Sequence, residues 1–472
     1  MRITAILDHK LRVARDELPA DLRSHLVDAL TIPNLAKREA EKQHQWGWEQ
    51  MPDKIALYSL DGDHMVMPRG FSADFADGMY LSGHDVEWTD NRYFPTMPEI
   101  GEHPDLRPWQ IPAWAAMRQF QQGIYKAPAG SGKTVTMLGL IQTLATPSLV
   151  IVNTKDILWQ WQKRAREFLG ADYPVGQIGD GIFEVSDYLT IATAQTLHSR
   201  FDNLEAAGFF DDEFGLVCLD ECHHATADTY NRVLDRFSAR YRLGVSATPD
   251  KTGDFALATR VLGPIIHETK PADVTTLMHP EVIRVPTKFG YGFRGTKSRW
   301  QRSNYPQMID ALIRDRDRNM LIVDNVLANE GHHQLLVSKR LEHLTILEDM
   351  ILEAGFLDPV HTLTGQDDNE SRQAAKELAE TRPCIILSTL ADEAMDIPRL
   401  DRLHLPYPQK NTGLVTQQVG RVERIHPDKH DAKIYDYTDM NVGPLERQWR
   451  GRRFEVYEPR GYKITVQKAA KA

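Results

Sequence analysis

The chain has 472 residues, of which 42% are hydrophobic and 26% are charged. This length exceeds one ordinary hydrophobic core and predicts about three domains of a globular protein. Its 56 basic and 66 acidic residues give a formal net charge of −10, which excludes a global basic field. Any site for a polyanion must therefore be a local groove.

Cysteine content and hydropathy exclude further classes of protein. Three cysteines are too few for a disulfide scaffold and fit a reducing compartment. Residues 1–10 lack the apolar core of a signal peptide. No run approaches the about 18 apolar residues that a membrane span requires. We therefore expect a soluble, cytoplasmic protein.

The first hundred residues differ from the rest. Short strand-like pieces separated by Asp-Gly and Pro-Arg-Gly turns predict a small mixed α+β accessory domain over residues 1–100. Trp46, Trp48 and Arg69 are residue types that contact nucleic acid, but we favour turn and core positions for them. A proline-punctuated linker follows over residues 93–104.

Strands and helices alternate from Leu106 onward, over a predicted domain at 101–268. The predicted strands are Ser148–Val152, Tyr188–Ala192, Gly215–Leu219 and Tyr241–Val245, and the predicted helices are Thr134–Leu144, Ile157–Leu169 and Tyr230–Phe237. This alternation predicts a parallel sheet covered by helices on both faces. Ligands then bind at the carboxyl ends of the strands.

A second α/β domain is predicted over residues 269–472, with no phosphate loop of its own. A charged helical region at Asn304–Leu327 precedes its sheet. The predicted strands are Gln334–Val337, Val360–Leu363, Cys384–Leu387, Arg402–Leu405 and Lys433–Tyr437. The basic and aromatic tail at 444–472 either lines a polyanion groove or forms a solvated helix face.

One segment has the pattern of a phosphate-binding loop. It runs Ala127-Pro128-Ala129-Gly130-Ser131-Gly132-Lys133-Thr134 between a predicted strand and a predicted helix. Small residues let backbone N–H groups surround phosphates, Lys133 reaches the β- and γ-phosphates, and the Thr134 hydroxyl ligates Mg²⁺. The alternative is a glycine-rich turn that caps a helix. The complete Gly-Lys-Thr ending favours a nucleotide site.

A second constellation is Asp220-Glu221-Cys222-His223, at the end of a predicted strand. Asp220 is predicted to hold Mg²⁺, and Glu221 to orient and deprotonate the attacking water. The alternatives are a plain strand end or a zinc site that includes Cys218, Cys222, His223 and His224. We disfavour zinc because Cys218 points to the opposite side of the strand from its neighbours.

Two further motifs follow. The run from Gly244 to Pro249 ends in Ser-Ala-Thr-Pro, which is a common turn by itself but becomes a coupling element after the acidic pair. The run from Gln417 to Arg424 places Arg421 and Arg424 at i and i+3, where they share a helix face. Such planar cations suit transition-state stabilisation on a γ-phosphate. A solvated basic helix is the alternative.

Taken in this order, the phosphate loop, D-E-C-H, S-A-T-P and Q-x-x-G-R-x-x-R resemble the superfamily 2 helicases and translocases over residues 106–425, with spacing similar to the XPB-like and UvsW-like phage DNA helicases. The resemblance implies two RecA-like domains in tandem, ATP as substrate and Mg²⁺ as cofactor. It also implies DNA as partner, other recombination or replication proteins as further partners, and the cytoplasm of a bacterium or infected host as location.

The resemblance also assigns residues. For catalysis it implies Lys133, Glu221, Gln417, Arg421 and Arg424, and for coupling His223, Ser246 and Thr248. For nucleotide binding it implies Arg107, Gln110, Ala129, Gly130, Ser131, Gly132, Lys133, Thr134 and Asp396, with Thr134 and Asp220 on the metal. For the nucleic-acid backbone it implies Thr154, Gln160, Trp161, Thr193, Gln195, Thr196, Ser338, Lys339, Arg340, Ser388 and Thr389.

The leading hypothesis is an ATP-dependent DNA helicase or translocase that unwinds or remodels branched DNA in recombination, repair or replication. An RNA helicase is the alternative of the same class, since these motifs grip a backbone and do not decide the sugar. A motor subunit of a restriction-type complex and a clamp with an inactive ATP site are the alternatives of other classes. Intact Lys133, Asp220 and Glu221 argue against the clamp.

Overall fold

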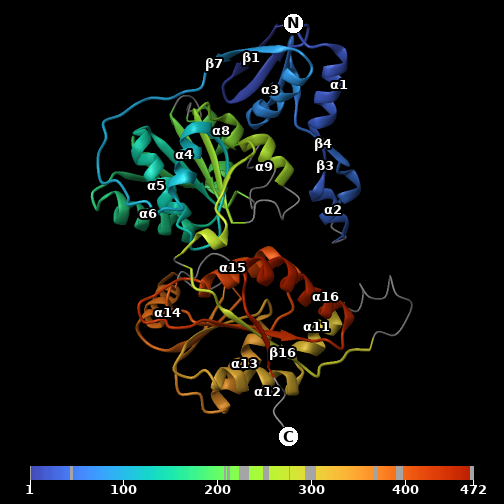
Figure 1. Ribbon diagram of the computed structural model, residues 1–472, viewed down its shortest axis with the longest axis vertical. Coiled ribbons are helices and arrows are strands. Elements are labelled where there is room, and N and C mark those ends of the chain that lie inside the picture. Colours follow the sequence, from blue (N-terminus) through green and yellow to red (C-terminus); the bar gives the residue numbers. More distant parts are fainter. Residues whose placement is uncertain are drawn as a thin grey trace. The chain divides into compact units, whose positions relative to one another are not determined.

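The computed structural model divides into two compact units, Met1–Asp273 and Val274–Ala472 (Figure 1). It describes residues 2–42, 46–206, 209, 213–222, 233–247, 255–275, 277–292, 305–364, 367, 369–389 and 397–467. The predicted fold class is confirmed, because each unit contains a predominantly parallel sheet of the RecA-like kind and the first carries an additional small sheet at its N-terminal end.

The N-terminal sheet has the strand order β5-β6-β2-β1-β7. Its strands are β1 (Arg2–Leu7), β2 (Lys10–Ala14), β5 (Ser59–Asp61), β6 (His64–Pro68) and β7 (Asp85–Asp90). Helices α1 (Ala20–Ala29) and α3 (Ser72–Leu81) accompany it (Figure 1). Alternate residues of β1 are buried, as expected for a sheet with one covered face.

A short ribbon extends from this sheet. Strands β3 (Thr31–Pro33) and β4 (Lys54–Ala56) pair antiparallel on either side of α2 (Leu35–Lys42). The prediction of a turn or core position holds for Trp46 as a turn position, because this residue lies in a turn beside the left-handed Gly47 and is fully exposed. It holds for Arg69, which is fully buried.

The main sheet of the first unit has the order β11-β10-β12-β9-β13-β14-β8-β15. Its strands are β8 (Gln122–Lys126), β9 (Ser148–Val152), β10 (Val175–Gly179), β11 (Ile182–Glu184), β12 (Leu189–Thr193), β13 (Leu216–Asp220), β14 (Tyr241–Ser246) and β15 (Ile265–Glu268). All neighbours are parallel except β10 and β11, which form an antiparallel hairpin. The four predicted strands are confirmed to within one residue at each end.

Helices cover both faces of this sheet because its central strands are apolar on both sides. Val150 and Val152 of β9 pack with α4 (Ile111–Phe120), α5 (Lys133–Leu144) and α6 (Lys155–Leu169). Leu149 and Ile151 pack with α7 (Ala194–Ser199), α8 (Phe201–Ala206) and α9 (Phe255–Leu262). Of the helix predicted at Tyr230–Phe237, the described part is a short 3-10 turn at Leu234–Arg236.

The N-terminal sheet and the main sheet of the first unit share one core. Arg69 lies between them and donates to Gln122 Oε1 at 3.0 Å, to the carbonyl of Ala239 at 2.5 Å and to that of Arg240 at 3.1 Å. A Cβ at Gly70 would lie 2.5 Å from the backbone N of Gly263, so only glycine permits this approach. The Pro-Arg-Gly segment, predicted as a turn, is therefore a buried connection.

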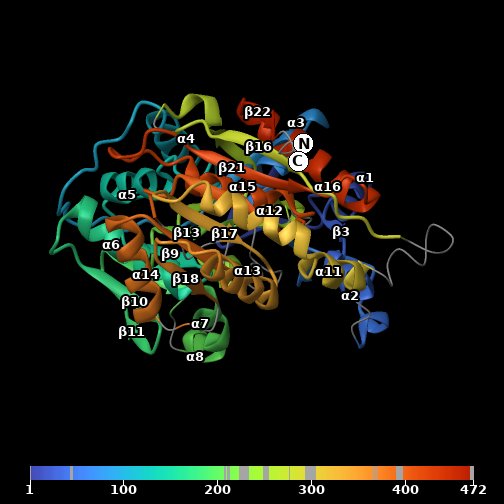
Figure 2. The same ribbon diagram turned by 90° about the horizontal axis from the view of Figure 1, so that it is seen from below.

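The second unit contains a seven-stranded sheet of order β18-β19-β17-β20-β21-β16-β22, parallel throughout. Its strands are β16 (Glu281–Pro286), β17 (His333–Val337), β18 (Val360–Leu363), β19 (Cys384–Ser388), β20 (Arg402–Leu405), β21 (Lys433–Thr438) and β22 (Ile464–Val466). The five predicted strands are confirmed. Figure 2 shows strands β16 to β18 and β21 with the helices around them.

Helices α12 (Arg316–Leu327) and α13 (Leu341–Glu353) pack on one face of this sheet, and α14 (Asn369–Thr381) and α15 (Thr412–Val422) on the other. The helical region predicted at Asn304–Leu327 is two helices, because Asp315 ends α11 (Tyr305–Ile313) and accepts from the N–H of Arg318 at 2.8 Å to begin α12.

The C-terminal tail belongs to the core of the second unit. Arg452, in α16 (Gly443–Arg452), forms a two-point ion pair with Asp436 of β21, with distances of 2.6 and 2.9 Å. Trp449, Tyr457 and Tyr462 are buried, and Phe454 is exposed. Most of the aromatic residues predicted for a polyanion groove therefore pack inside.

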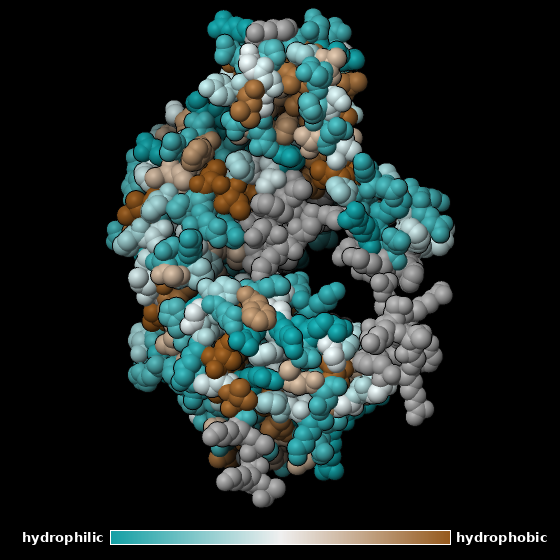
Figure 3. Space-filling model, turned by 45° about the vertical axis from the view of Figure 1, so that its right-hand side comes forward, coloured by the Kyte–Doolittle hydropathy of each residue, from teal (hydrophilic) through white to brown (hydrophobic). Residues whose placement is uncertain are grey.

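On the face drawn in Figure 3, hydrophobic residues form small separate groups among hydrophilic ones. None of the helices in the described parts of the chain combines the length and apolarity that a membrane-spanning helix needs.

Candidate active site

The phosphate loop joins the carboxyl end of β8 to the first turn of α5. Gly130 and Gly132 have φ of +77° and +84°, a region that favours glycine. A Cβ at Gly132 would lie 2.3 Å from the amide nitrogen of Gln110. The Lys133 ammonium donates to the carbonyl of Ala127 at 3.3 Å, so the side chain folds back over the loop.

Residues before α4 hold the loop from outside. The Gln110 amide donates to the carbonyls of Ser131 and Gly132 at 3.3 and 3.0 Å, and its oxygen accepts from the N–H of Arg107 at 2.8 Å. The Trp109 indole donates to the carbonyl of Ser131 at 3.1 Å, a contact that the sequence predictions missed. Arg107 is exposed and lies 5.5 Å from the Trp109 ring centroid. Base recognition by Arg107 and Gln110 stays a prediction.

The acidic pair ends β13 at the same edge of the sheet. Glu221 Oε1 lies 3.8 Å from Lys133 Nζ. Glu221 has a φ of +45°, which costs a non-glycine residue on the order of 1 kcal/mol. Two hydrogen bonds fix this conformation: Asn153 donates to the Glu221 carbonyl at 3.4 Å, and the Glu221 N–H donates to Asp220 Oδ1 at 2.9 Å. A strained residue beside the phosphate loop indicates a functional position.

Asp220 is buried, and burial followed by the charge of Glu221 raises the pKa of its carboxyl to about 6. The Trp161 indole opposes this effect by donating to Asp220 Oδ2 at 2.6 Å. Trp161 itself is only 1% exposed. The core therefore encloses the Trp161 ring and Asp220 occupies its donor, and a contact of Trp161 with nucleic acid stays a prediction.

The residues present fit a magnesium ion. The Asp220 carboxyl has a raised pKa and lies next to the Glu221 carboxylate, and a divalent cation would stabilise the two negative charges. Oxygen atoms are also the ligands that Mg²⁺ prefers. Asp220 supplies one oxygen. The half-buried Thr134, in the first turn of α5, offers a hydroxyl.

The zinc alternative is excluded for the two cysteines. Cys218 packs among the side chains on the α5 face of the sheet, and Cys222 packs on the α9 face, 3.1 Å from where a Cβ on Gly244 would lie. Burial raises the pKa of both thiols, which disfavours the thiolates that bind zinc. His223 and His224 lie outside the described residues, as do Thr248 and Asp396.

Ser246 of the Ser-Ala-Thr-Pro motif is the last residue of β14 and is fully buried. Its carbonyl accepts from the N–H of Ala127 at 3.0 Å. The end of β14 is therefore joined directly to the start of the phosphate loop, where a coupling element would have to lie.

The other half of the same sheet edge carries the predicted backbone-gripping residues. Thr154 follows β9 and caps α6 by accepting from the N–H of Ile157 at 3.4 Å. Thr193 ends β12 and caps α7 by accepting from the N–H of Thr196 at 3.4 Å. Thr154 and Gln195 are exposed, Gln160 and Thr196 are half-buried, and Thr193 is buried. Two helix N-termini thus open at this edge, an arrangement that suits phosphates.

In the second unit, the predicted grip residues divide by burial. Lys339 and Arg340 are exposed after β17, and Thr389 is half-buried after β19. Ser338 and Ser388 are fully buried; Ser388 donates to the carbonyl of Leu363 at 3.0 Å and Ser338 lies 3.1 Å from His343 Nδ1. Each of these two hydroxyls is occupied inside the unit, and their contact with nucleic acid stays a prediction.

The arginine motif lies at the end of α15. Gln417 is buried in the helix, and Arg421 is in its last turn. Arg424 lies beyond the helix, so the prediction that both arginines share a helix face is wrong. The physical reason is that the Lys429 ammonium donates to the carbonyls of Val422 and Arg424 at 2.7 and 2.8 Å. These carbonyls therefore have a hydrogen-bond donor where the helix ends and need no further helical turn.

Comparison with known proteins places these motifs in a family. The type III restriction enzyme res subunit family matches residues 103–251, which contain the phosphate loop and the acidic pair. "Probable helicase D10" of Escherichia phage T5 is 25% identical over 74% of this chain and 74% of its own length. "DNA 3'-5' translocase XPB2" of Sulfurisphaera tokodaii is 32% identical over 36% of this chain and 37% of its own. Together these matches support a superfamily 2 helicase of the group that includes XPB and the phage helicases.

A solved structure shares the fold. The fragment structure of a putative HsdR subunit of a type I restriction enzyme from Vibrio vulnificus aligns with 76% of this chain and 67% of its own, with a TM-score of 0.55 and 17% identity. The family match and the helicase relatives support an ATP-hydrolysing enzyme of the helicase class, and they imply a nucleic-acid substrate.

Proposed function

We propose that this helicase is an ATP-driven DNA translocase that unwinds or remodels branched duplex DNA during recombination, repair or replication. The observation that carries the proposal is the 3.8 Å approach of Lys133 to Glu221 beside Asp220, on the same sheet edge as the exposed Thr154. One half of this edge offers the groups for phosphoryl transfer, and the other offers helix N-termini for a phosphodiester backbone. Relatives are named for both nucleic acids: the XPB2 relative is a DNA translocase, and a relative from Acanthamoeba polyphaga mimivirus is a putative ATP-dependent RNA helicase. We choose DNA because the motif spacing resembles the XPB-like and UvsW-like DNA helicases.

In this mechanism, the loop N–H groups and Lys133 bind the phosphates of ATP. The Glu221 carboxylate orients the attacking water toward the γ-phosphorus and accepts a proton from this water. Asp220 and Thr134 would hold a magnesium ion, which would supply neutralisation of the phosphate charge. Asn153 holds the backbone of Glu221, so it is a positioning residue and touches no reacting atom.

Arg421 and Arg424 contribute in this proposal when the two RecA-like domains close on ATP. Their planar guanidinium groups would stabilise charge that develops on the γ-phosphate, and hydrolysis would release them. Gln417 would act with them from the same segment. Asp396, His223 and Thr248 are proposed to sense the nucleotide and transmit its state.

The decisive experiment measures ATP hydrolysis by the full chain alone and with single-stranded, duplex or forked DNA, or with matching RNA. We expect DNA to raise the rate at least severalfold, forked DNA to be unwound, and RNA to have little effect. Equal stimulation by RNA would reverse the choice of substrate. The absence of any stimulation, with a Lys133→Ala variant as background, would reject the proposal.

A second candidate is the motor subunit of a restriction-type complex, favoured by the matched family and by the HsdR fold neighbour. Its test is affinity purification of the tagged chain from its native cell. A stoichiometric nuclease partner would support this candidate, and purification of a single chain with intact unwinding activity would reject it.

A further inference from the structure

The β10–β11 hairpin lies at one end of the main sheet, next to the strands that carry the predicted grip residues. Its turn, Asp180-Gly181, follows the carboxyl end of β10. A Cβ at Gly179 would lie 3.0 Å from the Cγ2 and Oγ1 atoms of Thr193, so the hairpin packs directly on the start of α7. The Lys155 ammonium, one residue after Thr154, pairs with Asp180 at 2.7 Å. The hairpin therefore adjoins both gripping loops.

The outer strand of this hairpin exposes apolar side chains. Ile182, Phe183 and Val185 are 42%, 40% and 44% exposed. An edge strand with such residues is a liability unless something covers it. Because side chains alternate along a strand, Phe183 lies on the face that includes Ile178, its β10 partner, while Ile182 and Glu184 share the other.

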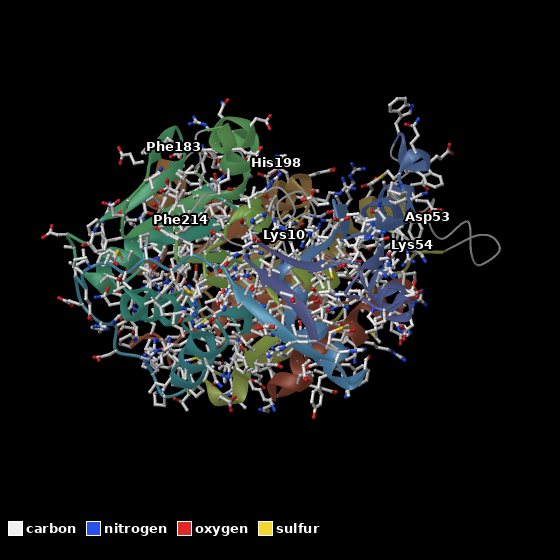
Figure 4. All side chains as sticks on the ribbon, turned by 90° about the horizontal axis from the view of Figure 1, so that it is seen from above. Lys10, Asp53, Lys54, Phe183, His198 and Phe214 are labelled. Atoms are coloured by element: carbon white, nitrogen blue, oxygen red, sulfur yellow. The ribbon has the colours of Figure 1, made fainter. Side chains whose placement is uncertain are left out.

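Phe183 is fixed in a way that suits a stacking platform. On one side its ring contacts Phe209, with ring centroids 6.2 Å apart, and Phe209 in turn contacts Phe214. The exposed Arg200 lies with its guanidinium carbon 5.6 Å from the Phe183 centroid. In Figure 4, Phe183 and His198 lie in the same region of the first unit as Phe214, and Figure 2 shows β10 and β11 beside α7 and α8.

The nearby charges favour a nucleic acid as the occupant. Asp180 is paired with Lys155, and Glu205 of α8 is paired with Arg236 at 3.3 Å. Glu184 lies on the strand face opposite to Phe183. Among the residues that the structure describes, Arg200 is the charged group that lies over the Phe183 ring, and a guanidinium next to an aromatic ring is a combination that stacks bases and pairs with phosphates.

We propose that Phe183 and Arg200 form a base-stacking platform that receives an unpaired base of the strand held by the Thr154 and Thr193 loops. The inference rests on the proposed function, since it assumes that a single strand follows this sheet edge. It adds that one base is held at a fixed position on the first unit while the backbone is gripped beside it. Stacking on an aromatic face tolerates every base, so the contact would be independent of sequence.

The test uses the full chain, an oligothymidine containing one 2-aminopurine at successive positions, and no ATP. We expect one position to change fluorescence sharply on binding and to lose that change in Phe183→Ala. Because a stacked base contributes about 1–3 kcal/mol, Phe183→Ala should weaken strand binding roughly 5-fold to 100-fold. The salt dependence of binding should stay unchanged, because no phosphate contact is removed.

Three variants separate stacking from folding. Phe183→Leu keeps apolar volume but removes the aromatic face, so it should resemble Phe183→Ala, whereas Phe183→Tyr should bind like the original chain. Ile182→Ala, on the opposite face of the same strand with similar exposure, is the matched control and should bind normally. Strand-free ATP hydrolysis and the melting temperature check the fold of each variant.

Each outcome decides a different point. If Phe183→Leu and Phe183→Tyr bind alike, or Ile182→Ala weakens binding as much as Phe183→Ala, the platform is rejected. If no Phe183 variant affects binding, the exposed strand has another occupant, such as a protein edge, and the platform is rejected too. If the original chain binds no single strand and shows no DNA-stimulated hydrolysis, the proposed function itself fails.

Discussion

The two halves of the main sheet edge in the first unit differ in how their polar groups are held. In the half formed by β8, β13 and β14, Lys133, Asp220 and Glu221 lie close together. Side-chain hydrogen bonds fix this half: Gln110 holds the carbonyl of Gly132 before Lys133, Trp161 holds Asp220, and Asn153 holds Glu221. In the half formed by β9, β12 and the hairpin, the threonines are fixed as helix caps and the groups around them are open to solvent.

This difference indicates that the two halves of the sheet edge have different functions. Phosphoryl transfer needs charged groups at fixed positions in a dry site, because a displaced donor loses most of its effect on the transition state. A sliding grip on a backbone needs exposed donors that exchange partners easily. Four substitutions test this division, and they are ordered by the size of the expected effect.

Replacing Lys133 by Ala removes the ammonium from the enclosed half. We expect ATP hydrolysis to fall roughly 100-fold to 1000-fold, the usual consequence of losing one preorganised charge at a transition state. Single-strand binding without ATP should change less than about twofold, because the open half is intact. Steady-state kinetics and fluorescence anisotropy measure the two quantities. A parallel loss of strand binding would contradict the division.

Replacing Thr154 by Ala changes the open half. It removes an exposed hydroxyl and the cap of α6, and caps contribute about 1 kcal/mol. We expect the DNA concentration for half-maximal stimulation to rise about fivefold to tenfold while strand-free hydrolysis stays constant. Thr154→Ser keeps the hydroxyl and serves as control. If the alanine variant loses strand-free hydrolysis, Thr154 belongs to the nucleotide half instead.

Replacing Asp220 by Asn is expected to stabilise the ligand-free protein. The difference between a folded pKa of about 6 and an unfolded value of about 3.9 corresponds to about 3 kcal/mol. Because the folded pKa is raised, Asp220 favours the folded state below pH 4 and loses that contribution as pH rises through 6.

The gain from Asp220→Asn should therefore be largest near pH 7.5, where the melting temperature rises by several degrees, and should shrink toward pH 4.5. Thermal unfolding without magnesium or nucleotide at the two pH values measures it. A gain that is equal at both values would show that ionisation of Asp220 does not oppose folding.

Replacing Trp161 by Phe keeps the buried ring but removes the hydrogen bond to Asp220 Oδ2. The pKa of Asp220 should rise further, since this bond lowers it. We expect the acidic limb of the hydrolysis profile to move to higher pH, with little change in the rate near pH 8. An unchanged profile, with magnesium held constant, would show that the indole serves only packing.

The sequence by itself determined the alternation of strands and helices and the residues of the nucleotide site. Apolar runs such as Ser148–Val152 become strands wherever both faces are covered, and the Gly-Lys-Thr loop needs a strand before it and a helix after it. Local pattern suffices for these features because their physical requirements are local.

Only the tertiary structure decided which polar side chains face a ligand and which serve the core. Trp161, Ser338 and Ser388 occupy motif positions but are enclosed by packing, and Arg69 holds two sheets together through carbonyls far away in the chain. The end of α15 before Arg424 depends on Lys429, and Phe183 gains its significance from Arg200. Burial and long-range hydrogen bonds arise from segments that meet only on folding, so no local pattern reports them.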